Sequence, residues 1–181
     1  MVSSNDKVEI TEDNKAIKNE VSKQSAINSS TLKVDLSGNT IIDKNDFQAN
    51  VIFLKKALSI ELVEGKSTLT IIVRGNNIWE QQPIKSVFEN STDANQLKTI
   101  MTAGTIVEND GNYIQKIPMV FEGELTVSKL TEKEVIIKIS GKGEILDYAS
   151  SKEQWKPISM TIICKNPNIK ISGANKETVY Y

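Results

Sequence analysis

From Thr31 onward, apolar and polar residues alternate with a period of two, and turn-forming residues separate one alternating run from the next. The first run extends from Leu32 to Leu36 and stops at Ser37-Gly38-Asn39. Successive side chains of a β-strand point to opposite faces, so this alternation is typical of strands with one buried face. The pattern recurs to the end of the chain and predicts an all-β fold.

The change in pattern near residue 30 divides the chain in two. Residues 1–30 are almost entirely polar and bury too little apolar surface to offset the entropy of ordering, so we expect a flexible polar N-terminal arm or linker. Residues 31–181 are long enough to bury a core of their own. We expect one β-rich domain there, a β-barrel or curved β-sandwich of about eight to ten antiparallel strands.

One segment, residues 91–104, interrupts the alternation with a helical pattern. It has a capping residue at its start, apolar residues that share a helix face and a glycine at its end. We therefore expect one short α-helix near residues 92–103. The residues that support it are Thr92, Ala94, Leu97, Met101 and Gly104.

The triplet Gly65-Lys66-Ser67 matches the end of a phosphate-binding P-loop. A P-loop needs glycine five residues before its second glycine, where this chain has Ile60, and it needs a helix after the lysine. Residues 68–73 alternate as a strand instead. We therefore interpret Gly65 as the sharp point of a hairpin turn. The expected cross-strand pairs are Leu62 with Leu69, Ile60 with Ile71 and Leu58 with Val73.

The segment from Val120 to Leu146 predicts a second, longer hairpin, because its apolar residues fall on odd numbers in both halves. Keeping both apolar sets on one face fixes the register. Inward-facing glycines let long strands bend, and an aromatic neighbour can cover their bare backbone, which favours a barrel. The expected pairs are Val127 with Ile137, Leu125 with Ile139, Gly123 with Gly141, Glu122 with Lys142, and Phe121 covering Gly143.

The composition removes many kinds of chemistry. The chain contains no histidine, Arg74 is its one arginine and Cys164 its one cysteine, and Cys164 falls on the apolar side of a strand pattern. Imidazole acid–base catalysis, histidine-ligated metals and arginine clusters are thereby excluded. Asp43-Lys44-Asn45-Asp46 lacks the glycine and glutamate of an EF-hand, and we expect a solvated turn there. We identify no catalytic, cofactor-binding or metal-binding residue and expect no enzyme.

The 22 basic and 23 acidic residues give a net charge of −1, which disfavours a nucleic-acid partner. No apolar run approaches the length of a transmembrane segment. The chain as given is expected to be soluble, in the cytoplasm or exported with its signal removed, and the compartment stays open.

Trp79 and Trp155 are the two largest apolar side chains, and both lie in loop-like surroundings. Tryptophan in such a place either caps the end of a barrel core or stands exposed as a binding hot spot. We keep both interpretations and treat these residues as candidate binding hot spots.

These features favour a non-catalytic binding or assembly domain. A β-barrel with a helix and an extended arm is similar in architecture to the tube-forming subunits of phage tails and contractile secretion systems, which implies self-assembly or protein partners engaged through the arm. The alternative is a lipocalin-like barrel that binds a small apolar ligand. In that case the start Ser3-Ser4-Asn5-Asp6 would follow the lipidated cysteine of a processed bacterial lipoprotein.

Overall fold

The computed structural model describes residues 27–88, 96–102, 106–109, 113–146 and 154–181, which fold almost entirely into β-strands. Eleven strands, a single 3-10 turn and a short helix make up this part of the chain. Their bounds are β1 (Ser29–Leu36), β2 (Asn39–Leu54), β3 (Ala57–Glu64), β4 (Ser67–Arg74), η1 (Ile78–Glu80), β5 (Ile84–Val87), β6 (Lys98–Thr102), β7 (Ile106–Asn109), β8 (Tyr113–Leu130), β9 (Glu134–Leu146), β10 (Lys156–Lys165), β11 (Asn168–Ser172) and α2 (Lys176–Val179).

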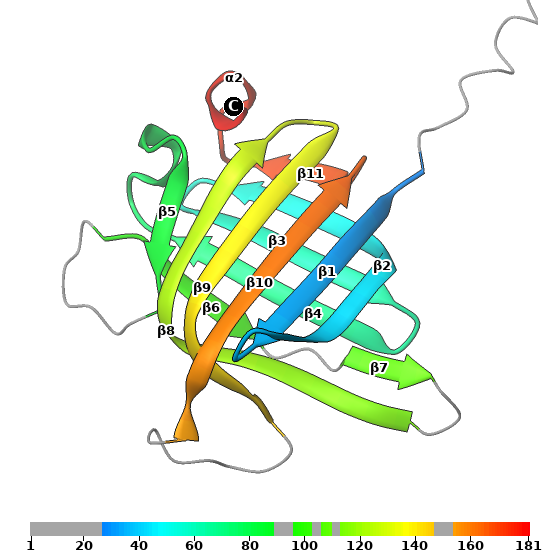
Figure 1. Ribbon diagram of the computed structural model, residues 1–181. Helices are drawn as coiled ribbons and strands as arrows, with labels where there is room; N and C mark the ends of the chain where they lie inside the picture. The colour runs from blue at the N-terminus through cyan, green and yellow to red at the C-terminus, as the bar shows by residue number, and fades with distance from the viewer. Residues whose placement is uncertain (1–26, 89–95, 103–105, 110–112, 147–153) are drawn as a thin grey trace, which may run out of the picture.

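Nine of the strands close into a barrel (Figure 1). The order around the wall is β1-β10-β9-β8-β5-β6-β4-β3-β2, and β1 closes the ring by pairing with β2 as well as with β10. Outside the ring, β11 pairs in parallel with the end of β2, and β7 pairs with β8. The prediction of an all-β fold is therefore confirmed, and of the two expected forms, barrel or curved sandwich, the structure is the barrel. Two pairings, β2 with β11 and β5 with β6, are parallel and not antiparallel as expected.

The alternation seen in the sequence builds the core. In β4 and β10 every second side chain is buried, and the same holds along most of the wall. Cys164 occupies one of these inward positions, and burial raises the pKa of its thiol to about 12, so it behaves as a small hydrophobe rather than a nucleophile.

The hairpin of β3 and β4 has the expected register, with Leu62 opposite Leu69, Ile60 opposite Ile71 and Leu58 opposite Val73. Gly65 lies in the turn with φ of 58°. This left-handed conformation suits glycine, which has no Cβ to clash with the backbone. The triplet that resembles a P-loop is therefore a hairpin turn.

The β8–β9 hairpin follows the predicted register for four of its five pairs: Val127 with Ile137, Leu125 with Ile139, Gly123 with Gly141 and Glu122 with Lys142. The fifth predicted pair is wrong. The register shifts between Val120 and Glu122, so that Val120 and not Phe121 lies opposite Gly143.

Phe121 is therefore the extra residue of a β-bulge, which re-aims its side chain away from the position that an unbroken alternation assigns to it. Both strands sweep through a bend in Figure 1. The bulge and the closely opposed glycines are features that allow such a bend, because glycine lets two backbones approach.

The helix predicted near residues 92–103 is wrong for residues 98–102, which form strand β6 and pair with β4. Residues 91–95 and 103–104 of the same prediction lie outside the described residues. Leu97 and Met101 are buried, as a helix face would also require, but the pairing partner of this segment is remote in sequence. Non-local pairing overrides local propensity here.

Two smaller expectations are also corrected. Asp43-Lys44-Asn45-Asp46 is not a turn but part of β2, at an irregularity in the pairing of β1 with β2. Strand β1 begins at Ser29, so the barrel starts slightly earlier than the expected boundary at residue 31. Asn28 already belongs to the folded part, because its side chain makes two hydrogen bonds to the backbone of Ala49.

The last residues of the chain fasten one end of the barrel. The Tyr181 hydroxyl donates to the carbonyl of Val127 at 2.7 Å and accepts from the amide of Ile84 at 2.8 Å. The backbone of Tyr181 also pairs with Leu130. These bonds connect β5 to β8. On its other side β5 is held weakly, because its parallel pairing with β6 consists of a single residue pair.

Candidate functional site

The interior of the barrel is filled by its own side chains. Phe47, Phe53, Leu58 and most other inward-facing residues are 0–2% exposed. A cavity wide enough for a ligand leaves accessible surface on the side chains around it, and the described core residues have almost none. Any binding site in the described part of the chain is therefore sought on the outside.

Trp79 lies in η1 and packs on the core rather than standing free. Its ring is 5.5 Å from that of Phe53, centroid to centroid, and its indole nitrogen donates to the carbonyl of Leu54 at 2.9 Å. The tryptophan thus holds the end of β2 in place.

Trp155 stacks on Phe121 at the other long hairpin, with ring centroids 4.4 Å apart and planes 15° apart. The bulge at Phe121 makes this contact possible, since it releases the ring from the position opposite Gly143. Trp79 and Trp155 contact different strands, β2 and β8, and the structure does not bring them together into one site.

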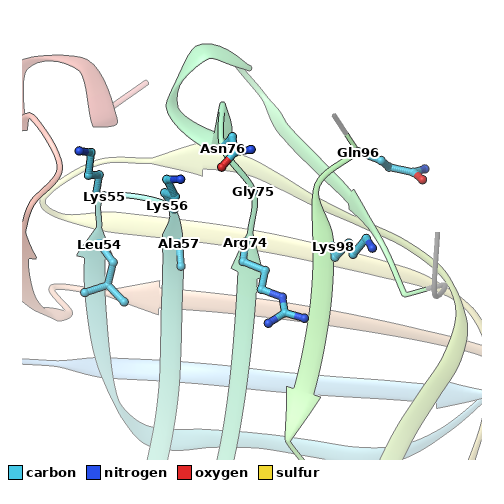
Figure 2. Close-up of a pocket in the computed structure, with 9 residues that line it drawn as sticks. All are labelled: Leu54, Lys55, Lys56, Ala57, Arg74, Gly75, Asn76, Gln96 and Lys98. Atoms are coloured by element: carbon cyan, nitrogen blue, oxygen red, sulfur yellow. The ribbon is translucent and has the colours of Figure 1, made fainter. Parts of the chain in front are cut away.

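A groove with a basic rim lies on the outer face of the barrel, at the ends of β2, β3, β4 and β6 (Figure 2). Its volume is about 620 Å³, within the range of sites that hold a small ligand or a few side chains. We call it the basic groove, because four of the nine described residues that line it are cationic and none of these nine is acidic. They are Leu54, Lys55, Lys56, Ala57, Arg74, Gly75, Asn76, Gln96 and Lys98.

Strand register assembles the groove from distant parts of the sequence. Leu54 lies opposite Ala57, Ala57 opposite Arg74, and Arg74 opposite Lys98, so one row crosses four strands. The buried neighbours of these residues, Phe53, Leu58 and Val73, point inward, and the row therefore points outward. Figure 2 shows the turn residues Lys55 and Lys56 above this row.

The next row of outward residues is mostly apolar. Ile52 lies opposite Ser59, Ser59 opposite Ile72, and Ile72 opposite Ile100. Ile100 is 37% exposed and Leu54 is 39% exposed, which makes them two of the few large apolar side chains on the described surface. This row continues along the same strands outside the lining of the groove, whose own apolar floor consists of Leu54 and Ala57 beside the cationic rim.

Three cations of the rim differ from Lys44 and Lys176 in their ion pairing. Lys44 forms an ion pair with Glu64 at 2.7 Å, and Lys176 pairs with Glu132 at 2.7 Å. Within the described residues, Lys55, Lys56 and Arg74 form no ion pair. Their charge is thus available to an external anionic group.

Other kinds of site have less support in the described residues. They contain no group of three or more metal-ligating side chains. Their buried polar residues are Ser30, Ser67, Ser86 and Thr99, none of which carries a charge. None of the helices in this part of the chain is long and apolar enough to cross a membrane.

Comparison of the chain with protein-family models, with curated proteins and with solved structures finds no significant match.

The sequence interpretation missed the basic groove. Two signals were present: the doublet Lys55-Lys56 between two strand patterns, and the placement of the one arginine, Arg74, at the end of a strand. They become a site only when the register sets Arg74 beside Lys98.

Proposed function

We propose that this protein is a non-catalytic assembly domain that joins copies of itself through its N-terminal arm. The observation that carries the proposal is the basic groove, an outward surface with exposed Leu54 and with three cations, Lys55, Lys56 and Arg74, that form no ion pair among the described residues. An apolar floor within a charged rim is the usual anatomy of a protein-binding surface.

The closed wall supports this function. A closed barrel has few free strand edges, so it does not aggregate edge to edge and can present one specific surface instead. Tube-forming subunits of phage tails and secretion systems are the class of assembly that a barrel with an arm fits best, by architecture alone.

The alternative function, a lipocalin-like barrel that binds a small apolar ligand, requires an internal cavity. Because core residues such as Phe47 and Val51 are fully buried, the described interior lends that alternative no support. We therefore place recognition on the surface of the barrel.

The proposal is tested by sedimentation velocity over a wide range of protein concentration, with the full chain and with a chain that lacks residues 1–26. The truncation stops there because Asn28 and Ser29 are part of the fold. We expect the full chain to associate and the truncated chain, checked for an intact barrel by circular dichroism and its thermal midpoint, to sediment as a monomer. A full chain that stays monomeric at every concentration contradicts the proposal.

A further inference from the structure

The basic groove sets chemical requirements for its occupant. Four cations line it, at Lys55, Lys56, Arg74 and Lys98, beside an apolar floor that includes Leu54. The matching ligand carries several negative charges interleaved with apolar side chains. The whole chain has a net charge of −1, so this local excess of positive charge is a property of the groove and not of the protein in general.

One segment of the chain outside the described residues has this composition. Residues 8–13 read Val-Glu-Ile-Thr-Glu-Asp, with three acidic residues, two apolar residues and no basic residue. In an extended backbone Val8, Ile10 and Glu12 project to one side and Glu9, Thr11 and Asp13 to the other, so one face is mostly apolar and the other mostly acidic. The segment is complementary to the groove in both respects.

The arm is long enough to deliver this segment. Its base is fixed where Asn28 binds the backbone of Ala49, and Leu54 lies five residues further along β2, about 17 Å away. Thirteen residues lie between Asp13 and Ile27, and this stretch spans up to about 46 Å when extended. That length exceeds the distance to the groove on the same barrel and leaves length to cross to a neighbouring one.

We propose that the basic groove is the docking site for residues 8–13 of a neighbouring copy's arm, an inference that rests on the assembly function proposed above. The apolar side chains Val8 and Ile10 lie over Leu54 and Ala57, and the carboxylates face the cationic rim. Because each copy has one arm and one groove, the contact joins unlike surfaces, and it closes as a reciprocal dimer or a larger ring or continues as a filament.

Charge reversal tests the contact in the full chain. Lys56→Glu/Arg74→Glu reverses the charge of the groove, and Glu9→Lys/Asp13→Lys reverses the charge of the acidic face of the arm. We expect either pair to raise the dissociation constant for self-association at least about tenfold. A chain with all four changes keeps the net charge of −1 and regains association, because the two reversed surfaces again attract.

The matched control is Lys138→Glu/Lys142→Glu on the outer face of β9, which changes the net charge by the same amount as the groove variant. Both lysines are exposed, and β9 lies three places from β6 around the wall. We expect association to be unchanged. If the groove variant associates as wild type does, or if the control loses association equally, the docking site is wrong.

Disulfide trapping tests whether the arm crosses to a neighbour. A chain with Ile10→Cys is mixed with a chain with Leu54→Cys under mild oxidation, and the natural Cys164 does not interfere because it is buried. We expect a covalent dimer, and none when Leu54→Cys is replaced by Lys138→Cys. If a disulfide forms only when both cysteines are in one chain, the arm docks on its own barrel and the inference is overturned.

The outcomes separate this inference from the proposed function. If wild type associates but the groove variant does too, assembly stands and its docking site lies elsewhere. If wild type never associates, the assembly function itself fails. Sedimentation with phosphatidylglycerol vesicles completes the test, since vesicle binding that is lost in the groove variant and kept in the arm variant assigns the groove to a lipid surface and overturns the arm contact.

Discussion

The β3–β4 and β8–β9 hairpins have the same alternating pattern, but they are held in shape by different means. The first is uniform, with every pair in register from Ala57 with Arg74 to Glu64 with Ser67, and its geometry follows from one glycine turn. The second contains two register shifts and leans on residues remote in sequence, Trp155 and Tyr181. A local pattern determines the first hairpin, and tertiary contacts shape the second.

The largest expected effect comes from replacing a glycine by alanine, a substitution that can be made in both hairpins. A Cβ on Gly143 would lie against the backbone carbonyl of Met119 and close to Ile158. The backbone of a paired strand cannot move away from the added Cβ as a flexible side chain can. We therefore expect Gly143→Ala to lower the free energy of unfolding by about 2 to 3 kcal/mol. Urea denaturation measures the change.

Gly65→Ala is the matched control in the simple hairpin. No atom lies within 4 Å of a Cβ added there, and only its φ of 58° is unfavourable for alanine. We expect a loss of about 1 kcal/mol from this backbone strain alone. Equal losses at Gly143 and Gly65 would show that close backbone approach does not distinguish the two hairpins.

The second test removes the remote support of β8 at Tyr181. Tyr181→Phe keeps the ring but leaves the amide of Ile84 and the carbonyl of Val127 without their shared partner. An unsatisfied buried donor costs about 1 to 3 kcal/mol, and we expect a loss in this range by urea denaturation. Tyr180→Phe is the control, since the ring contact of Tyr180 with Phe53 survives the change, and its loss should be clearly smaller.

The Tyr181 hydroxyl also makes the free energy of unfolding depend on pH. Burial raises the pKa of Tyr181, and the bond from Ile84 opposes this only in part. The folded state therefore holds the proton more tightly than the unfolded state. The stabilisation by protonated Tyr181 is complete below the pKa of the unfolded state, about 10, and is lost as the pH rises through the pKa of the folded state. We expect wild type to lose more stability than Tyr181→Phe above that pH, and parallel curves would contradict this assignment.

How far the sequence predicts the structure follows the same division. Alternation alone predicts the register of β3 with β4, the inward residues of β10 and the burial of Cys164. When two neighbouring strands both alternate with a period of two, pairing them with their apolar residues on the same face fixes the register. The bulge at Phe121 could not, since an extra residue leaves no mark in an alternation that continues through it.

Segments with weak local preference were the hardest to predict. The spacing of Leu97 and Met101 suits a helix, but strand β4 offers residues 98–102 a long row of backbone partners, and pairing prevails. The basic groove was invisible for a related reason. Its cations come from one turn and two strand ends, and only the register brings Arg74 beside Lys98.

The third test examines what the bulge does. Phe121 stacks on Trp155, so a double-mutant cycle of Phe121→Ala and Trp155→Ala should show a coupling of about 0.5 to 1.5 kcal/mol. Had Phe121 covered Gly143, as an unbroken alternation requires, the two losses would simply add. Additive losses would therefore restore the simpler geometry for β8 and remove its dependence on Trp155.

The smallest expected effect concerns the outer face of the same hairpin, where Glu122 lies opposite Lys142. Exchanging the two residues as Glu122→Lys/Lys142→Glu keeps the net charge, the strand pairing and the opposition of unlike charges. Pairs of this kind at a surface contribute little, so we expect the free energy of unfolding to change by less than about 0.5 kcal/mol. A loss comparable to that of Gly143→Ala would mean that side-chain charge, rather than close backbone approach and the bulge, shapes β8 and β9. A near-neutral exchange leaves the opposed glycines and the remote tyrosine as the features that set this hairpin apart from β3 and β4.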